Sequence, residues 1–169
     1  MPIPMSQASA PRFAQMLKNL SAILAKAQAH CEARKIDPLV LTSSRLYPDM
    51  FPLARQVQIA SDSAKGAVAR LAGVEIPKYE DTEKTFEELQ ARIARTLEFI
   101  GSVKPAQIDG SEDKAIVIKL PNRELHFTGV QFLQAFAMPN FYFHVTTAYD
   151  ILRHNGVELG KSDFLGGGP

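Results

Sequence analysis

The segment NFYFHVTTAYDILRHNG, residues 140–156, has the pattern of one amphipathic helix with a defined end. At about 100° per residue, a single face collects Phe141, His144, Val145, Ala148, Ile151 and Leu152. A second face carries Tyr142, Thr146, Tyr149 and Arg153. Gly156 follows the last turn, where a left-handed cap favours glycine. The segment therefore predicts a helix that packs against a core and directs the imidazole of His144 inward.

Three earlier segments repeat the spacing of apolar residues that amphipathic helices show. They cover residues 12–34, about 52–72, and 85 to about 101. The third begins with Thr85 and Glu88, which are spaced as a capping box. With the helix that contains residues 140–156, the sequence predicts four long helices.

The segment KAIVIKLPNRELHFTG, residues 114–129, has the alternating pattern of a β-hairpin, with a turn at Pro121 and Asn122. Because an isolated hairpin is marginally stable in water, we expect it to lie over one face of the helices. The resulting fold class is all-α, a four-helix bundle with a small hairpin inserted between the third and fourth helices, forming one domain over residues 1–169.

The fourth helix has a clear start and an ambiguous middle. Thr128 and Gln131 are spaced as a second capping box. Pro139 lies farther along, where it either kinks this helix or begins a new one in its first turn. Both alternatives place residues up to Asn155 in a helix.

Composition restricts the class of function. The formal net charge is +1, from 19 basic and 18 acidic residues, which disfavours nucleic acid and anionic membranes as partners. The single cysteine, Cys31, excludes an intramolecular disulfide and fits a reducing compartment. The N-terminal segment lacks the apolar run of a secretory signal, and no segment approaches the ~20 apolar residues that span a bilayer. We therefore expect a cytoplasmic protein.

Common catalytic motifs are absent from the sequence, including phosphate-binding glycine loops, CxxC pairs, HExxH and GxSxG. His144 is the main candidate functional residue that remains. His154 lies in the last turn, where a cation favours the helix dipole. For an inward histidine such as His144, the most frequent role is a hydrogen bond to a facing side chain.

The segment from Pro139 to Gly166, the hairpin KLPNRELHFTG and the segment TFEELQARIARTLEFI resemble a family of bacterial and fungal proteins, domain-of-unknown-function family nineteen ninety-three. The resemblance covers nearly the whole chain. This family is grouped with the DinB and YfiT-like superfamily, so the resemblance implies a DinB-like four-helix bundle, often assembled as a homodimer.

In DinB-like proteins, one histidine on the second helix and two on the fourth hold a divalent metal. Carried onto this sequence, those positions fall roughly on Gln56, Asn140 and His144, while Gln58 and Asp62 are poorer candidates for the second-helix position. Amides are weak ligands for Zn or Ni, which prefer imidazole and thiolate. We therefore expect no cofactor, with a divalent metal on His144 as the alternative, and a hydrogen-bonded polar cluster in place of the metal centre.

Three hypotheses for function follow. The first is a metal-free protein that binds a small molecule in a pocket walled by aromatic rings. Its residues are Gln56, Asn140, Phe141, Tyr142, His144 and Tyr149. The second is a structural or stress-related dimer. The third, implied by the superfamily, is a thiol-dependent transferase or isomerase that uses His144 as a metal ligand or general base.

Two further segments are candidates for a functional surface. The segment SRLYPDMFPLARQ, residues 44–56, either lines the entrance of a cleft or forms a rigid loop before a helix. The C-terminal segment VELGKSDFLGGGP, residues 157–169, contains Phe164 and Leu165, which we expect to anchor on the bundle or on a partner subunit.

Overall fold

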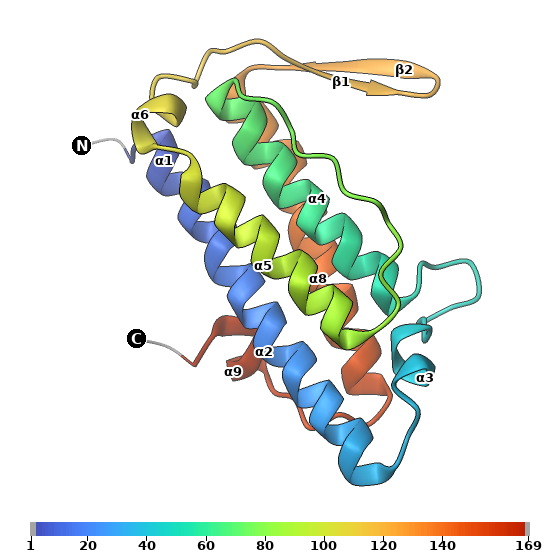
Figure 1. The fold of residues 1–169 in the computed structure, drawn as a ribbon. Coiled ribbons are helices and arrows are strands. Elements are labelled where there is room, and N and C mark those ends of the chain that lie inside the picture. The colour runs from blue at the N-terminus through green and yellow to red at the C-terminus, as the bar shows by residue number, and fades with distance from the viewer. Residues whose placement is uncertain (1–2, 168–169) are drawn as a thin grey trace.

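The computed structural model describes residues 3–167, and its four longest helices pack side by side as a bundle (Figure 1). In chain order the elements are α1 (Met5–Ala8), α2 (Ala10–Arg34), α3 (Pro38–Thr42), α4 (Leu53–Ala72), α5 (Phe86–Ser102), α6 (Pro105–Ile108), β1 (Ile116–Leu120), β2 (Arg123–Phe127), α7 (Gly129–Gln131), η1 (Phe132–Ala137), α8 (Met138–His154) and α9 (Lys161–Leu165). The predicted helical bundle with an inserted hairpin is confirmed.

The core lies between α2, α4, α5 and α8. The inward face of α4 contains the fully buried alanines Ala60 and Ala64, which allow close approach of neighbouring helices. Phe13 of α2 meets Phe141 of α8 edge to face, with ring centroids 5.0 Å apart. Both rings are fully buried or nearly so. The apolar stripes predicted from the sequence therefore form one continuous core.

Local capping chemistry fixes the helix ends. The Thr85 side chain accepts a hydrogen bond from the backbone N–H of Glu88, and the Glu88 carboxylate accepts from the backbone N–H of Thr85. At the other end of the preceding helix, Gly73 has φ +72°, a conformation that glycine adopts without strain. These caps determine where α4 ends and α5 begins.

The hairpin lies at the end of the bundle where α4 finishes (Figure 1). Its strands pair antiparallel, and the pair Leu120 and Arg123 closes the predicted turn. Ile116 and Ile118 point toward the bundle and are buried. Phe127 contacts Phe136 of η1, with ring centroids 5.5 Å apart. These apolar contacts attach the hairpin to the start of the fourth long helix.

A π-helical segment, η1, joins α7 to α8, and Pro139 lies in the first turn of α8. Proline has no N–H to donate, and its ring would collide with a carbonyl of the preceding turn of an α-helix. The wider π turn moves these carbonyls away, so the helical path continues from Gly129 to His154. Of the two predicted alternatives, the position in a first turn is the one observed, because Pro139 lies in the first turn of α8, which directly follows η1.

The C-terminal segment docks on the same chain. The Asn19 side-chain amide donates to the Phe164 carbonyl at 2.9 Å. Asp163 forms an ion pair with Lys26 at 2.6 Å, and the Phe164 ring meets Tyr149. Of the two predicted alternatives, docking on the chain's own bundle is the one observed for Phe164, whereas Leu165 is exposed and does not act as an anchor there. Residues 168–169 of this segment lie outside the described part of the chain.

Between residues 3 and 167, no helix is both long enough and apolar enough to cross a bilayer.

Candidate functional site

The structure brings Gln56 of α4 to His144 of α8. The Gln56 Oε1 atom lies 2.7 Å from His144 Nδ1. The Gln56 Nε2 atom donates to the Phe51 carbonyl at 3.0 Å. Gln56 is buried and His144 is half-buried. The two residues that the resemblance places on facing helices are therefore direct hydrogen-bond partners.

This arrangement selects one tautomer of the imidazole. A carbonyl oxygen only accepts hydrogen bonds, so the atom of Gln56 that faces Phe51 must be the amide nitrogen. The amide oxygen then faces His144 and also only accepts, so Nδ1 carries the proton. In the neutral imidazole, Nε2 is left as an acceptor. Within residues 3–167, Nε2 has no hydrogen-bond partner.

The surroundings favour the neutral imidazole. Burial lowers the pKa of His144, and the positive charge of Arg55 lowers it further. The Phe143 ring meets the imidazole edge to face, with centroids 5.3 Å apart. Phe143 and Phe51 are exposed, at 58% and 54%. The imidazole thus lies at the boundary between core and solvent, whereas the sequence pattern predicted that it points inward and away from solvent.

We expect the stability of the protein to fall below about pH 6.5 because of His144. The folded pKa is lower than the ordinary 6.5, so the unfolded chain takes up the proton first as the pH drops. The stabilising effect of the neutral form is complete above the ordinary pKa and is lost as the pH falls through the folded pKa. Urea unfolding of the wild type and His144→Leu between pH 4 and 8 tests this. Parallel stability curves across this range would contradict it.

The other predicted pocket residues lie elsewhere. The Asn140 side-chain amide donates to the Phe136 carbonyl at 2.6 Å and is exposed. Tyr142 packs against Phe141, and Tyr149 packs against Phe164, with ring centroids 5.6 Å and 6.1 Å apart. On a helix, Tyr149 is rotated by ~140° from His144. The structure therefore does not bring all six predicted residues together, because the two tyrosines occupy a different face of α8.

The residues at this position do not fit a DinB-like metal centre. Across residues 3–167, no group of three or more His, Cys, Asp or Glu side chains is arranged to hold a metal ion. Gln56 Oε1 is already engaged by His144 Nδ1, so the pair offers one free imidazole nitrogen. Zinc and nickel sites need several imidazole or thiolate ligands.

A buried charged network that the sequence pattern does not predict lies between α4, α5 and the loop that joins them. Its centre is Arg92, which is 0% exposed. One guanidinium nitrogen lies 3.0 Å from both carboxylate oxygens of Glu83. The other lies 2.8 Å from Asp62 and 3.0 Å from Asp81. We refer to Arg92, Asp62, Asp81 and Glu83 as the Arg92 network.

Further cations and one aromatic ring surround the Arg92 network. Lys65 pairs with Asp62 at 2.8 Å, and Arg55 pairs with Asp81. Burial alone would raise the pKa of Asp81, but hydrogen bonds and charges from Arg55 and Arg92 outweigh it and hold that pKa below its ordinary value. The Tyr79 ring lies beneath the Arg92 guanidinium, 5.1 Å from ring centroid to Cζ. These charges are mutually compensated, which is typical of a structural network.

One signal could have identified Arg92 from the sequence. It lies three residues after Leu89 and four before Thr96, on the inward stripe of its helix. A cation on an inward stripe requires buried acidic partners. Asp81 and Glu83, just before the helix, were available candidates.

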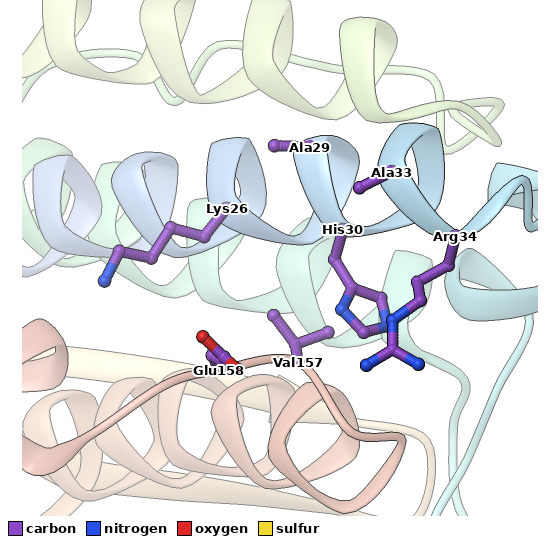
Figure 2. A pocket seen from close by; sticks show the side chains of 7 residues that line it. All are labelled: Lys26, Ala29, His30, Ala33, Arg34, Val157 and Glu158. Atoms are coloured by element: carbon purple, nitrogen blue, oxygen red, sulfur yellow. The ribbon is translucent and has the colours of Figure 1, made fainter.

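A cavity of about 450 Å³ lies between α2 and the segment that follows α8 (Figure 2). Figure 2 shows Lys26, His30 and Arg34 along one face of α2, opposite Val157 and Glu158. The Lys26 ammonium is bound to Asp163. Because Asp163 compensates Lys26 and Glu158 lies opposite the same face of α2, we rank this cavity below the Gln56 and His144 pair as a candidate for ligand recognition.

Comparisons with known proteins identify a family and agree with the helical bundle. A family model described as Domain of unknown function (DUF1993) matches residues 5–165. The chain is also similar to a crystal structure of a DinB family member protein from Shewanella denitrificans, with 47% sequence identity and a TM-score of 0.89. That similarity covers 97% of this chain and 93% of the other. A search of curated proteins gives no match.

Proposed function

We propose that this chain, which belongs to the family of domains of unknown function DUF1993 and has a DinB-like fold, binds a small molecule through the neutral imidazole of His144. The proposal is carried by the hydrogen bonds that run from the Phe51 carbonyl through Gln56 to His144 Nδ1. They orient the ring and leave Nε2 as an acceptor for a ligand.

The ligand class follows from the neighbours of the imidazole. Phe51 and Phe143 expose apolar rings beside the pair, and a bound molecule would remove their surfaces from water. Nε2 requires a hydrogen-bond donor from the ligand. We therefore propose a flat, partly apolar molecule that carries a hydroxyl or N–H group.

We propose that binding is independent of metal. Gln56 contributes an amide where DinB-like proteins place a histidine, and its oxygen is committed to His144 Nδ1. The lowered pKa of His144 keeps the ring neutral without a bound cation. A divalent metal such as Zn or Ni on His144 alone would have a single good protein ligand.

An enzyme is the second candidate, because a neutral imidazole with an available Nε2 is also suited to act as a general base. The ring is half-buried and held in one tautomer by Gln56. Its neighbours Phe51, Phe143 and Arg55 cannot relay a proton at neutral pH. Binding without catalysis is therefore the better-supported proposal.

The homodimer stays a prediction from the family resemblance. Large exposed apolar side chains on α3, in the segment between α3 and α4, and on α8 would favour it. They are Leu39, Val40, Leu46, Tyr47, Phe51 and Phe143.

Titration with phenol and anisole tests the binding proposal. Both molecules carry an aromatic ring, but only phenol has a hydroxyl donor. In ¹⁵N NMR spectra of labelled histidine at pH 7.5, we expect the free protein to show a protonated Nδ1 at His144. Phenol should then shift the Nε2 resonance in a saturable way, and anisole should bind about tenfold or more weakly.

Three controls make the result specific. Gln56→Leu should abolish the tautomer preference, His144→Leu should abolish phenol binding, and excess EDTA should change neither the spectra nor the affinity. Equal affinity for phenol and anisole, or a protonated Nε2 in the free protein, would overturn the proposal.

A further inference from the structure

Arg70, in the last turn of α4, is a half-buried cation without a carboxylate partner among residues 3–167. Its one hydrogen bond there is from Nη1 to the Gly66 carbonyl, at 3.0 Å. By contrast, the buried cations Lys65 and Arg92 each lie 2.8 Å from a carboxylate oxygen. Buried charges are normally paired. Arg70 therefore has donors available for an anion that the described chain does not supply.

The guanidinium lies in the wall of a cavity of about 220 Å³ between α4, β1 and the helical segment η1 and α8. Ile118, Phe132 and Phe136 form its apolar side. Ser63 and Asn140 contribute a hydroxyl and an amide. Apolar walls with a few polar groups are characteristic of sites for small organic molecules.

The π-helical segment shapes the apolar wall. Phe132 and Phe136, both in η1, stack with ring centroids 6.0 Å apart and planes inclined by 25°. The Arg70 guanidinium lies over the same wall, 6.0 Å from the Phe132 centroid. A planar apolar group and a charged group can therefore be accommodated next to each other.

Gly66 makes room for this position of Arg70. A Cβ atom at Gly66 would lie 2.6 Å from Arg70 Nη1, which is closer than the two atoms can approach. Glycine within a helix is less stable than alanine. Because Gly66 has no side chain, the guanidinium of Arg70 can lie next to it and donate to its carbonyl.

Asp62 also lines the cavity, but its charge is compensated. Its Oδ1 atom contacts both Lys65 and Arg92 at 2.8 Å. It is also eight residues from Arg70 on α4, a separation of about 12 Å along the helix axis. Repulsion between Asp62 and an anion bound to Arg70 is therefore small.

We propose that this cavity binds a small organic anion, with a carboxylate or phosphate group on Arg70 and a planar apolar group against Phe132 and Phe136. Burial lowers the pKa of Arg70, and a bound anion would offset the same loss of solvation. Asn140, which the resemblance places in a metal centre, then serves this cavity. The inference does not depend on the proposed role of His144.

Benzoate, benzamide and inorganic phosphate test the proposal at matched ionic strength. The side-chain resonances of Arg70 and Asn140 provide the readout by NMR. We expect benzoate to shift both in a saturable way, and both benzamide and phosphate to bind at least tenfold more weakly. If benzamide binds as tightly as benzoate, the site does not recognise the negative charge. If phosphate binds as tightly as benzoate, the site does not recognise the apolar group. Either result would overturn the proposal. Failure of benzoate to saturate would overturn the site.

Two substitutions separate binding from folding. Arg70→Gln should weaken benzoate binding at least tenfold. Gly66→Ala should have the same effect on binding while leaving the thermal unfolding midpoint equal or higher, because alanine favours the helix and displaces only the guanidinium. Arg153→Gln, on the exposed face of α8, is the matched control and should bind benzoate as the wild type does. Wild-type affinity in a folded Gly66→Ala protein would contradict the proposal.

Discussion

Replacing Arg92 with methionine is expected to lower the free energy of unfolding by about 3–5 kcal/mol. The substitution removes the shared partner of three carboxylates, including Glu83, which is 8% exposed. Glu83 keeps a hydrogen bond from the Gln58 amide at 3.1 Å and one cation, the exposed Arg95, at 3.5 Å. A buried carboxylate that loses its main partner retains its desolvation penalty, so the cost exceeds that of the lost hydrogen bonds. Urea unfolding at pH 7 measures the effect.

Arg95→Met is the matched control. Arg95 contacts the same carboxylate, but its side chain is 55% exposed, so its removal should cost less than about 1 kcal/mol. The double variant Arg92→Met with Glu83→Leu should recover part of the loss, because both buried charges are then gone. If Arg92→Met and Arg95→Met lower the free energy of unfolding equally, burial does not determine how much each arginine stabilises the protein.

The sequence predicted the fold well because local signals and the apolar pattern agree. Thr85 with Glu88 predicted the start of α5, and Gly73 closes α4 in the left-handed conformation that favours glycine. The hairpin followed from strict alternation around Pro121 and Asn122. Each of these signals acts over a few residues, so it can be interpreted without knowledge of distant contacts.

The candidate site was less predictable because it depends on contacts between distant segments. The family resemblance identified the facing positions Gln56 and His144, but the tautomer follows only from the contact with Phe51, which the sequence does not reveal. The predicted pocket includes Tyr142 and Tyr149 as aromatic walls, although both lie on the second face of the helix pattern. The helical rotation separates Tyr149 from His144, and Phe164 of the C-terminal segment covers it.

Arg92 shows a different limit. The apolar pattern of α5 predicts which face is buried, and a single arginine on that face interrupts the pattern without indicating its partners. Its carboxylate partners lie on α4 and on the loop before α5, and their convergence depends on how the bundle folds. Chemistry that involves several segments thus becomes visible only after the fold is known.

The substitution Gly129→Ala is expected to destabilise the protein by about 3 kcal/mol. A Cβ atom at this position would lie 1.9 Å from the Ser111 carbonyl oxygen and 2.9 Å from its carbon. Backbone atoms cannot move aside as the end of a side chain can. The segments around residues 111 and 129 must therefore move apart to admit the methyl group. The adjacent Val130 N–H donates to the Glu112 carbonyl at 3.0 Å, and this bond joins the two ends of the hairpin insertion.

Gly101→Ala is the matched control, because the same added methyl group at α5 meets nothing within 4 Å. It should raise the free energy of unfolding by about 0.5 kcal/mol through helix propensity alone. Opposite signs for the two Gly→Ala substitutions would show that the contact between Gly129 and Ser111, and not the residue type, sets the cost. In hydrogen exchange, the amides of β1 and β2 should lose protection in Gly129→Ala before those of α2, since the hairpin loses its attachment at this point. Wild-type stability and unchanged hairpin protection would mean that the segments around residues 111 and 129 separate at little cost.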